Sequence, residues 1–204
     1  MNKLILSLGI ALWAMGTQAQ VVNIPDTNFL KALINHRPKI DLNNNGQIEV
    51  SEAQVVDTLV LFSVKIKDLS GIDFFTSLTL LSCSLNDIYS LDLSKNLLLS
   101  YLSCDYNQLS SLDLSNNIAL TYLTCTGNHM QTLNITKNVL LQRLSCEFNE
   151  FMTLDVSQNT ALISFSCSNN QLTTLDLSKN LALKYLGISL NSFKSSLDVS
   201  QNIA

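Results

Sequence analysis

The sequence predicts a repeat solenoid, in which the chain winds into stacked turns of 21 residues with short parallel β-strands on two sides of each turn. The five cysteines of the 204-residue chain are separated by equal intervals of 21 residues. Asparagine recurs in two series with the same period, apart from a last interval of 22 residues in the second, which begins about ten residues after the first. Such regular spacing is typical of turns that each pack only on their neighbours. The positions are Cys83, Cys104, Cys125, Cys146 and Cys167 for cysteine, Asn86, Asn107, Asn128, Asn149, Asn170 and Asn191 for the first asparagine series, and Asn96, Asn117, Asn138, Asn159, Asn180 and Asn202 for the second.

Residues 1–19 have the pattern of a signal peptide for export. A basic start that ends at Lys3 is followed by an apolar run from Leu4 to Met15 and by a small-residue cleavage site that ends at Ala19. The apolar run is too short to span a bilayer as a helix. We therefore expect cleavage after Ala19 and a mature chain that is secreted or held at the cell surface, with no membrane insertion.

Residues 20–57 differ in composition from the rest and are predicted to cap the amino-terminal end of the solenoid. Pro25 and Asp26 are typical of a helix start, and apolar residues recur at helical spacing from Phe29 to Ile34. Pro38 prevents the helix from continuing. The sequence thus predicts an amphipathic helix over residues 26–36 that covers the first turn of the solenoid.

The stretch from Asp41 to Glu52 resembles the EF-hand calcium loop along its whole length. The resemblance implies a calcium ion surrounded by side-chain oxygens, one backbone carbonyl and a bidentate carboxylate. A single loop with neutral amides at two ligand positions implies modest affinity and a structural ion that fixes the cap on the repeats. A polar turn that keeps this shape without an ion is the alternative. The implied ligands are Asp41, Asn43, Asn45, Gln47 through its carbonyl and Glu52, with Gly46 at the sharp turn and Glu49 acting through water.

Residues 58–204 carry the pattern LxxLxCxxNxL, which reads clearly from Leu99 through Leu102, Cys104 and Asn107 to Leu109. This pattern resembles the leucine-rich-repeat consensus in the short bacterial form found in internalins. The resemblance implies a solenoid that works by binding. Because the chain stops at Ala204 within a repeat, we expect a longer natural protein with a further domain, and self-association of this chain through its uncapped end.

Residues of a strand alternate between its two sides, so the pattern assigns each side chain an orientation. Leu102 and Cys104 are predicted to point inward, whereas Tyr101, Ser103 and Asp105 point outward. Because each cysteine replaces an inward apolar residue, we expect reduced, structural thiols rather than disulfides or metal ligands.

The asparagines of both series are expected to end strands and to bond backbone groups of the turns. The glycosylation sequon that begins at Asn134 falls within one of these series, so we expect its asparagine to be buried. A row of aspartates on the second strand face is interpreted as a solvated surface, because neighbouring serines can donate hydrogen bonds to it.

The outward residues of the first strand face are the candidate ligand-binding residues. One row combines tyrosine with arginine, the residue types that concentrate energy in interfaces, and a row of hydroxyl side chains lies beside it. This combination suits a protein or glycan ligand; the alternative function is a structural spacer that displays another domain. The candidate residues are Tyr101, Tyr122, Arg143, Tyr185, Ser103, Asp105 and Glu147.

Charge and composition argue against several other functions. The net charge is -4 and the sequence has no cluster of Lys or Arg, so the footprint of nucleic-acid or anionic-membrane binding is missing. Only two histidines, His36 and His129, are present, and no GxSxG, HExxH or glycine-rich phosphate motif occurs. We therefore expect no enzymatic activity and no catalytic residues.

Overall fold

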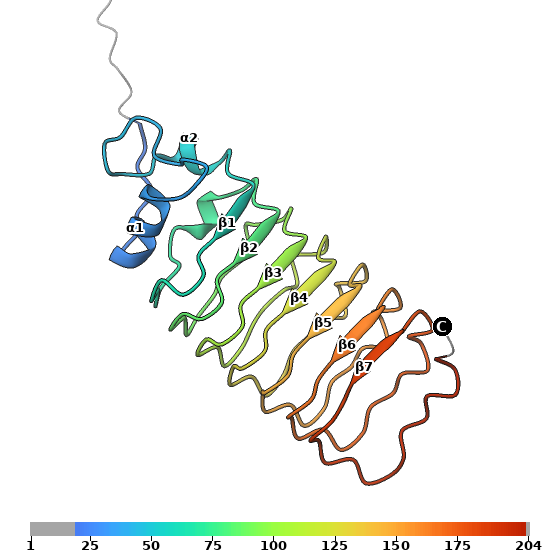
Figure 1. The fold of residues 1–204 in the computed structure, drawn as a ribbon. Helices are drawn as coiled ribbons and strands as arrows, with labels where there is room; N and C mark the ends of the chain where they lie inside the picture. The colour runs from blue at the N-terminus through green and yellow to red at the C-terminus, as the bar shows by residue number, and fades with distance from the viewer. Residues whose placement is uncertain (1–18, 203–204) are drawn as a thin grey trace, which may run out of the picture.

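The computed structural model describes residues 19–202, which wind into a solenoid with one seven-stranded parallel sheet along one side (Figure 1). The strands follow one another in sequence order. Leu80 pairs with Tyr101 and Tyr101 with Tyr122, so from β2 onward the register advances by one 21-residue repeat per strand. The predicted repeat solenoid is confirmed. The strands are β1 Thr58–Val60, β2 Leu80–Ser82, β3 Tyr101–Ser103, β4 Tyr122–Thr124, β5 Arg143–Ser145, β6 Ser164–Ser166 and β7 Tyr185–Gly187.

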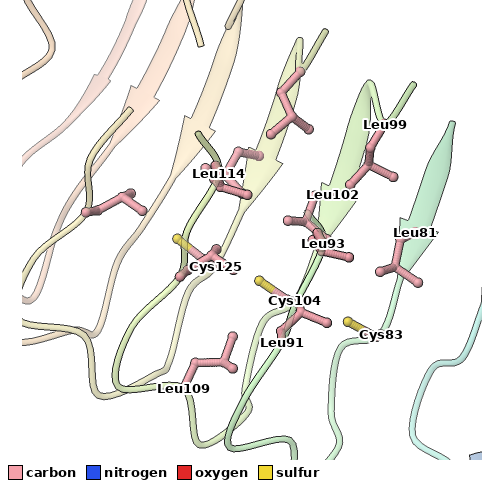
Figure 2. Packing of buried hydrophobic residues seen from close by; sticks show 14 of the residues in the cluster. Leu81, Cys83, Leu91, Leu93, Leu99, Leu102, Cys104, Leu109, Leu114 and Cys125 are labelled. Atoms are coloured by element: carbon pink, nitrogen blue, oxygen red, sulfur yellow. The ribbon is translucent and has the colours of Figure 1, made fainter. Parts of the chain in front are cut away.

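The interior of the solenoid is a continuous apolar core in which the cysteines stack at equivalent positions. All five cysteines are free and buried, as predicted. Figure 2 shows Cys83, Cys104 and Cys125 in neighbouring turns, among the leucines of the core. Desolvation by burial, with a smaller effect of the Asp105 charge, raises the pKa of Cys83 to about 12. The thiol therefore stays protonated and packs as a small apolar side chain.

The second side of the coil differs from the prediction, because no strands occur there within residues 19–202. The carboxylate of Asp92 accepts a hydrogen bond from the N–H of Ser94 at 2.9 Å, and Asp113 accepts one from Ser115 at the same distance. These local turns bend the backbone and use amides that a second set of strands would need. Leu93 still points into the core and is 1% exposed.

The first asparagine series bonds the backbone of two turns at once. The side-chain amide of Asn107 donates to the carbonyls of Cys83 and Cys104, both at 3.1 Å. Its Oδ1 accepts a hydrogen bond from the N–H of Ile88 at 3.1 Å. Each asparagine of this series therefore closes the end of its own strand and joins it to the preceding turn, as predicted.

The second asparagine series joins the turns on the side that lacks strands. The side-chain amide of Asn117 donates to the carbonyl of Leu93 at 3.1 Å and to that of Asn96 at 2.9 Å. Asn134 is not part of this series. It lies exposed in the aspartate row, where its Oδ1 accepts a hydrogen bond from the N–H of Thr136 at 3.1 Å. The expectation that Asn134 is buried is therefore wrong, because its position in the repeat is that of the outward aspartates.

The cap contains helix α1, Thr27–Ile34, and the short helix α2, Val50–Ala53. A 3-10 turn, η1, Ile72–Phe74, follows strand β1. The predicted amphipathic helix is confirmed by α1. Its Phe29 is fully buried, and the Phe29 ring centroid lies 6.4 Å from that of Phe75 in the first repeat. The cap therefore shares one apolar core with the solenoid.

The predicted signal peptide covers residues 1–19, and all of it except Ala19 lies outside the described residues. Within residues 19–202, no helix is long and apolar enough to cross a membrane.

Candidate binding surface

The sheet face carries a stacked pair of tyrosines at the start of strands β3 and β4. The register pairs Tyr101 with Tyr122, and their ring centroids lie 4.2 Å apart at an interplanar angle of 11°. Desolvation by burial, followed by the influence of the neighbouring Tyr122, raises the pKa of the Tyr101 phenol. The pair is a preformed aromatic surface, and the Tyr101 phenol stays protonated and able to donate hydrogen bonds at neutral pH.

Arg143 and Tyr185 continue this row toward the carboxyl end of the solenoid. Arg143 pairs in register with Tyr122 and is exposed. Tyr185 is 67% exposed, but Ser164 on strand β6 separates it from Arg143. The structure therefore brings Tyr101, Tyr122 and Arg143 together on adjacent strands and places Tyr185 apart from them.

The predicted hydroxyl row has less free surface than its outward orientation suggests. Ser103 is only 8% exposed. Its Oγ lies 2.7 Å from the Oγ of Ser84 and donates a hydrogen bond to Oδ2 of Asp105 at 3.2 Å. Hydroxyls on adjacent turns about 4.8 Å apart reach one another. Ser103 is therefore mainly a structural residue that orients Asp105.

Asp105 and Glu147 lie where strands β3 and β5 end, on the opposite edge of the sheet face from the tyrosine pair. Oδ1 of Asp105 accepts a hydrogen bond from the N–H of Thr126 at 2.7 Å and another from the Thr124 hydroxyl. Glu147 accepts one from the Ser166 hydroxyl. Both carboxylates are partly exposed, and these contacts fix their orientation.

A second aromatic position, directly after these carboxylates, was missed by sequence reasoning. Tyr106 and Phe148 are each 52% exposed. Their φ angles of 52° and 51° lie in the left-handed region that favours glycine and asparagine. The equivalent residues of the other turns, Leu85, Gly127, Asn169 and Leu190, also have positive φ. Glycine or asparagine at this position is a sequence signal of a left-handed turn, in which the side chain of the left-handed residue points outward.

The 41–52 loop has a tight backbone shape maintained by its own side chains. Asn44 and Gly46 have left-handed φ angles of 62° and 77°. The Asp41 carboxylate accepts hydrogen bonds from the N–H of Asn45 at 3.2 Å and of Gly46 at 3.1 Å. Oδ1 of Asn43 also accepts from the N–H of Asn45, at 2.9 Å. These contacts orient oxygen atoms of Asp41 and Asn43 toward the loop backbone.

The remaining implied ligands of the loop are engaged with other protein groups. Glu52 accepts hydrogen bonds from the N–H of Leu42 at 2.8 Å and of Glu49 at 3.0 Å. Oδ1 of Asn45 accepts from the N–H of Gln47 at 2.8 Å, and the Asn45 amide donates to Glu49 at 2.6 Å. In the part of the chain that the structure describes, no three His, Cys, Asp or Glu side chains stand as a metal-binding group. The donor types suit calcium, but ligation would require Glu52 to leave its backbone partners.

No protein-family model and no curated protein matches the chain. Among solved structures, the functional domain of InlJ from Listeria monocytogenes, which includes a cysteine ladder, is 29% identical, with a TM-score of 0.51 and coverage of 91% of this chain and 50% of that chain. A leucine-rich-repeat protein from Leptospira interrogans is 22% identical, with a TM-score of 0.64 and coverage of 76% and 43%. Internalin C2 from Listeria monocytogenes is 17% identical, with a TM-score of 0.63 and coverage of 92% and 93%.

This chain thus spans half or less of the length of the first two proteins. The two structures that are less than 25% identical support the fold alone. The likeness to InlJ extends to a feature of the core, because this chain also stacks free cysteines in successive turns. The chain is a leucine-rich-repeat solenoid that resembles bacterial internalins.

Proposed function

We propose that the chain is a secreted or cell-surface binding module that recognises another protein through the exposed face of its sheet. The observation that carries the proposal is the stacked pair of Tyr101 and Tyr122, with Arg143 beside it on the next strand. Tyrosine and arginine are enriched among the residues that dominate binding energy in protein interfaces. Rings that are already stacked lose little conformational freedom when a partner covers them.

A glycan is the second class of ligand that this surface suits, but the geometry favours a protein. Sugar recognition depends on free hydrogen-bonding groups. The Ser103 hydroxyl is nearly buried and is engaged with Ser84 and Asp105. The surface that remains accessible at the start of the strands is aromatic and cationic, which matches the chemistry of a protein interface.

The proposed role involves no catalysis. Nδ1 of His36 lies 3.0 Å from the carbonyl oxygen of Pro38 within the cap. Nε2 of His129 lies 3.1 Å from the side-chain oxygen of Gln108 on the surface. Both imidazoles thus make local structural contacts, and a binding role accounts for the exposed aromatic pair without a reaction.

The test compares tyrosines at two places on the solenoid. The double variant Tyr101→Ala/Tyr122→Ala and the wild type are assayed for binding to immobilised extracellular proteins and to a glycan array. Tyr89→Ala is the matched control, because Tyr89 is 62% exposed and lies outside the strands. Loss of protein binding in the double variant alone supports the proposal. Loss of glycan binding alone assigns the surface to sugars, and equal binding by all three chains favours a structural spacer.

We also propose that calcium is a structural ligand of the 41–52 loop. Support comes from the left-handed turn at Gly46 and from the position of Glu52 within helix α2. An ion shared by Asp41 and Glu52 would join the loop to that helix. It would thereby stiffen the cap next to strand β1, which is a structural role rather than a switch.

A further inference from the structure

Three successive turns carry an unusual set of neighbouring residues just beyond the ends of strands β3, β4 and β5. The register of these strands places equivalent residues side by side. A carboxylate followed by an aromatic ring occurs on the first and third turns, and a small pair lies between them. We call this set the acidic-aromatic shelf, and it consists of Asp105, Tyr106, Thr126, Gly127, Glu147 and Phe148.

The shelf is built around a close approach between Tyr106 and Gly127. A Cβ atom added to Gly127 would lie 2.5 Å from Cδ1 and 2.8 Å from Cε1 of Tyr106. The Tyr106 ring therefore leans across the glycine of the next turn, toward the turn that carries Phe148. Gly127 leaves the space that the Tyr106 ring occupies, because any side chain there would displace the ring.

The turn itself does not require an aromatic ring at these two positions. Tyr106 and Phe148 have left-handed φ angles of 52° and 51°, a conformation that is unfavourable for bulky residues. Each ring nevertheless remains 52% exposed, so much of its apolar surface is not buried by the chain itself. The equivalent residues Leu85, Asn169 and Leu190 adopt the same left-handed turn without an aromatic ring. The rings thus occupy disfavoured backbone positions and still present surface to a partner.

Fixed negative charge accompanies the rings. Asp105 is oriented by the Thr126 N–H at 2.7 Å, and Glu147 is oriented by the Ser166 hydroxyl. Within residues 19–202, the one contact of ion-pair type joins the His129 imidazole to Glu150 at 3.7 Å, and it uses neither shelf carboxylate. A carboxylate beside an aromatic face is complementary to the ammonium group of lysine or the guanidinium group of arginine.

We infer that the acidic-aromatic shelf binds a segment of a partner protein that presents lysine or arginine side chains. One cation lies over Tyr106 beside Asp105, and a second lies over Phe148 beside Glu147. This inference rests on the proposed binding function and names the chemistry of the partner at the far edge of the same sheet face. Charge complementarity selects this occupant, because the shelf offers carboxylates and aromatic faces together.

The geometry also predicts the spacing of the cations. Successive turns lie about 4.8 Å apart, so the two carboxylate-aromatic pairs are about 9.6 Å apart. In an extended polyproline helix, residues three apart point the same way and are separated by about 9.3 Å. A segment with arginine at every third position therefore matches the shelf.

The test titrates the full chain with two synthetic peptides of equal charge and composition. The matching probe is Arg-Pro-Pro-Arg-Pro-Pro-Arg, and the control probe is Arg-Arg-Arg-Pro-Pro-Pro-Pro. The expected result is at least tenfold tighter binding of the matching probe by the wild type. Substitutions Tyr106→Asn and Phe148→Asn should together abolish that preference while leaving the melting temperature unchanged or higher, because asparagine tolerates the left-handed turn.

Asp113→Asn is the matched acidic control, because Asp113 is an exposed carboxylate on the other side of the coil. Equal binding of the two probes by the wild type, or equal loss of binding in the Asp113 variant, overturns the shelf proposal. Either result leaves the protein and glycan assay of the Tyr101→Ala/Tyr122→Ala variant unaffected. Conversely, selective binding of the matching probe supports the shelf proposal even when the Tyr101→Ala/Tyr122→Ala variant binds extracellular proteins as well as the wild type does.

Discussion

The carboxylate of Asp26 in the cap accepts a hydrogen bond from the backbone N–H of Lys67 in the first repeat, at 2.8 Å. Its other oxygen accepts hydrogen bonds from Asn28 at 2.8 Å and from Phe29 at 3.0 Å, the first amides of helix α1. One side chain therefore begins the helix and joins the cap to the solenoid.

Replacing Asp26 with alanine should destabilise the protein by about 2 kcal/mol. Loss of a helix N-cap costs about 0.5 to 2 kcal/mol, and the amide of Lys67 loses its partner as well. Urea unfolding followed by circular dichroism measures the change. Asp87→Ala is the control, because Asp87 is exposed, whereas the side chain that caps the helix is that of Asp26. Equal unfolding midpoints for the two variants would refute the joining role of Asp26.

The Asp26 contacts should also give a pH-dependent stability. Burial alone would raise the pKa of Asp26, but hydrogen bonds from Lys67, Phe29 and other backbone amides outweigh it and lower the pKa below its ordinary value of 3.8. The stabilisation is therefore complete above about pH 3.8 and is lost as the pH falls below it. Unfolding curves from pH 6 down to about pH 2.5 should show the wild type losing its advantage over Asp26→Asn in that acidic window.

The buried thiols should be almost inert in the folded protein. Desolvation raises the pKa of Cys83 and of Cys167 to about 12, from 9.0. At pH 8 the thiolate fraction is then about 1,000-fold smaller than for an ordinary cysteine. We expect a thiol reagent such as Ellman's reagent to label the native chain at least about 100-fold more slowly than the urea-unfolded chain. Rapid labelling of several thiols in the native protein would contradict a stacked cysteine core.

The periodic sequence predicted the features that every repeat shares. The spacing of Cys104 and Cys125 determines the length of the turn and hence the register of the sheet, because equivalent residues must stack to bury their apolar sides. The helix of the cap was predictable from Asp26 and the apolar spacing that follows it, since both signals lie within a few residues of each other.

Features that depend on neighbouring turns were harder to predict. Strands were expected on both sides, but Asp92 and its equivalents form local turns, and asparagine amides join the turns there instead. Ser103 was expected to be available, but its hydroxyl contacts that of Ser84, just beyond the end of the adjacent strand. Tyr106 was overlooked because its exposure follows from a left-handed φ angle, which the alternation of strand residues does not describe.

Calcium should stabilise the cap if the 41–52 loop binds it. A ligand at about 100 times its dissociation constant adds about 2.7 kcal/mol of stability, which raises the melting temperature of a domain of this size by about 5 to 10 °C. Differential scanning calorimetry with calcium, magnesium or a chelator measures this shift. Glu52→Gln should remove the response to calcium, whereas Asp176→Asn on the second side should keep it. The same melting temperature in calcium and in chelator would remove the calcium proposal.

Alanine at Gly127 separates the packing of Tyr106 from the conformation of the backbone. Gly127 has a φ angle of 67°, and an added Cβ meets the Tyr106 ring at 2.5 Å. Gly46 has a φ angle of 77°, but an added Cβ there meets no atom within 4 Å. Gly46→Ala in the presence of a chelator should therefore cost only the left-handed backbone penalty of about 1 to 2 kcal/mol. Gly127→Ala should cost more, by the energy needed to displace the ring.

A double-mutant cycle isolates that additional energy. In the Tyr106→Asn background the ring is absent, so Gly127→Ala should cost no more than Gly46→Ala does in the wild type. The difference between the two backgrounds, measured by urea unfolding, is the coupling between Gly127 and Tyr106. An equal cost of Gly127→Ala in both backgrounds would mean that the Tyr106 ring does not pack on the glycine. The acidic-aromatic shelf would then lack the contact that positions Tyr106.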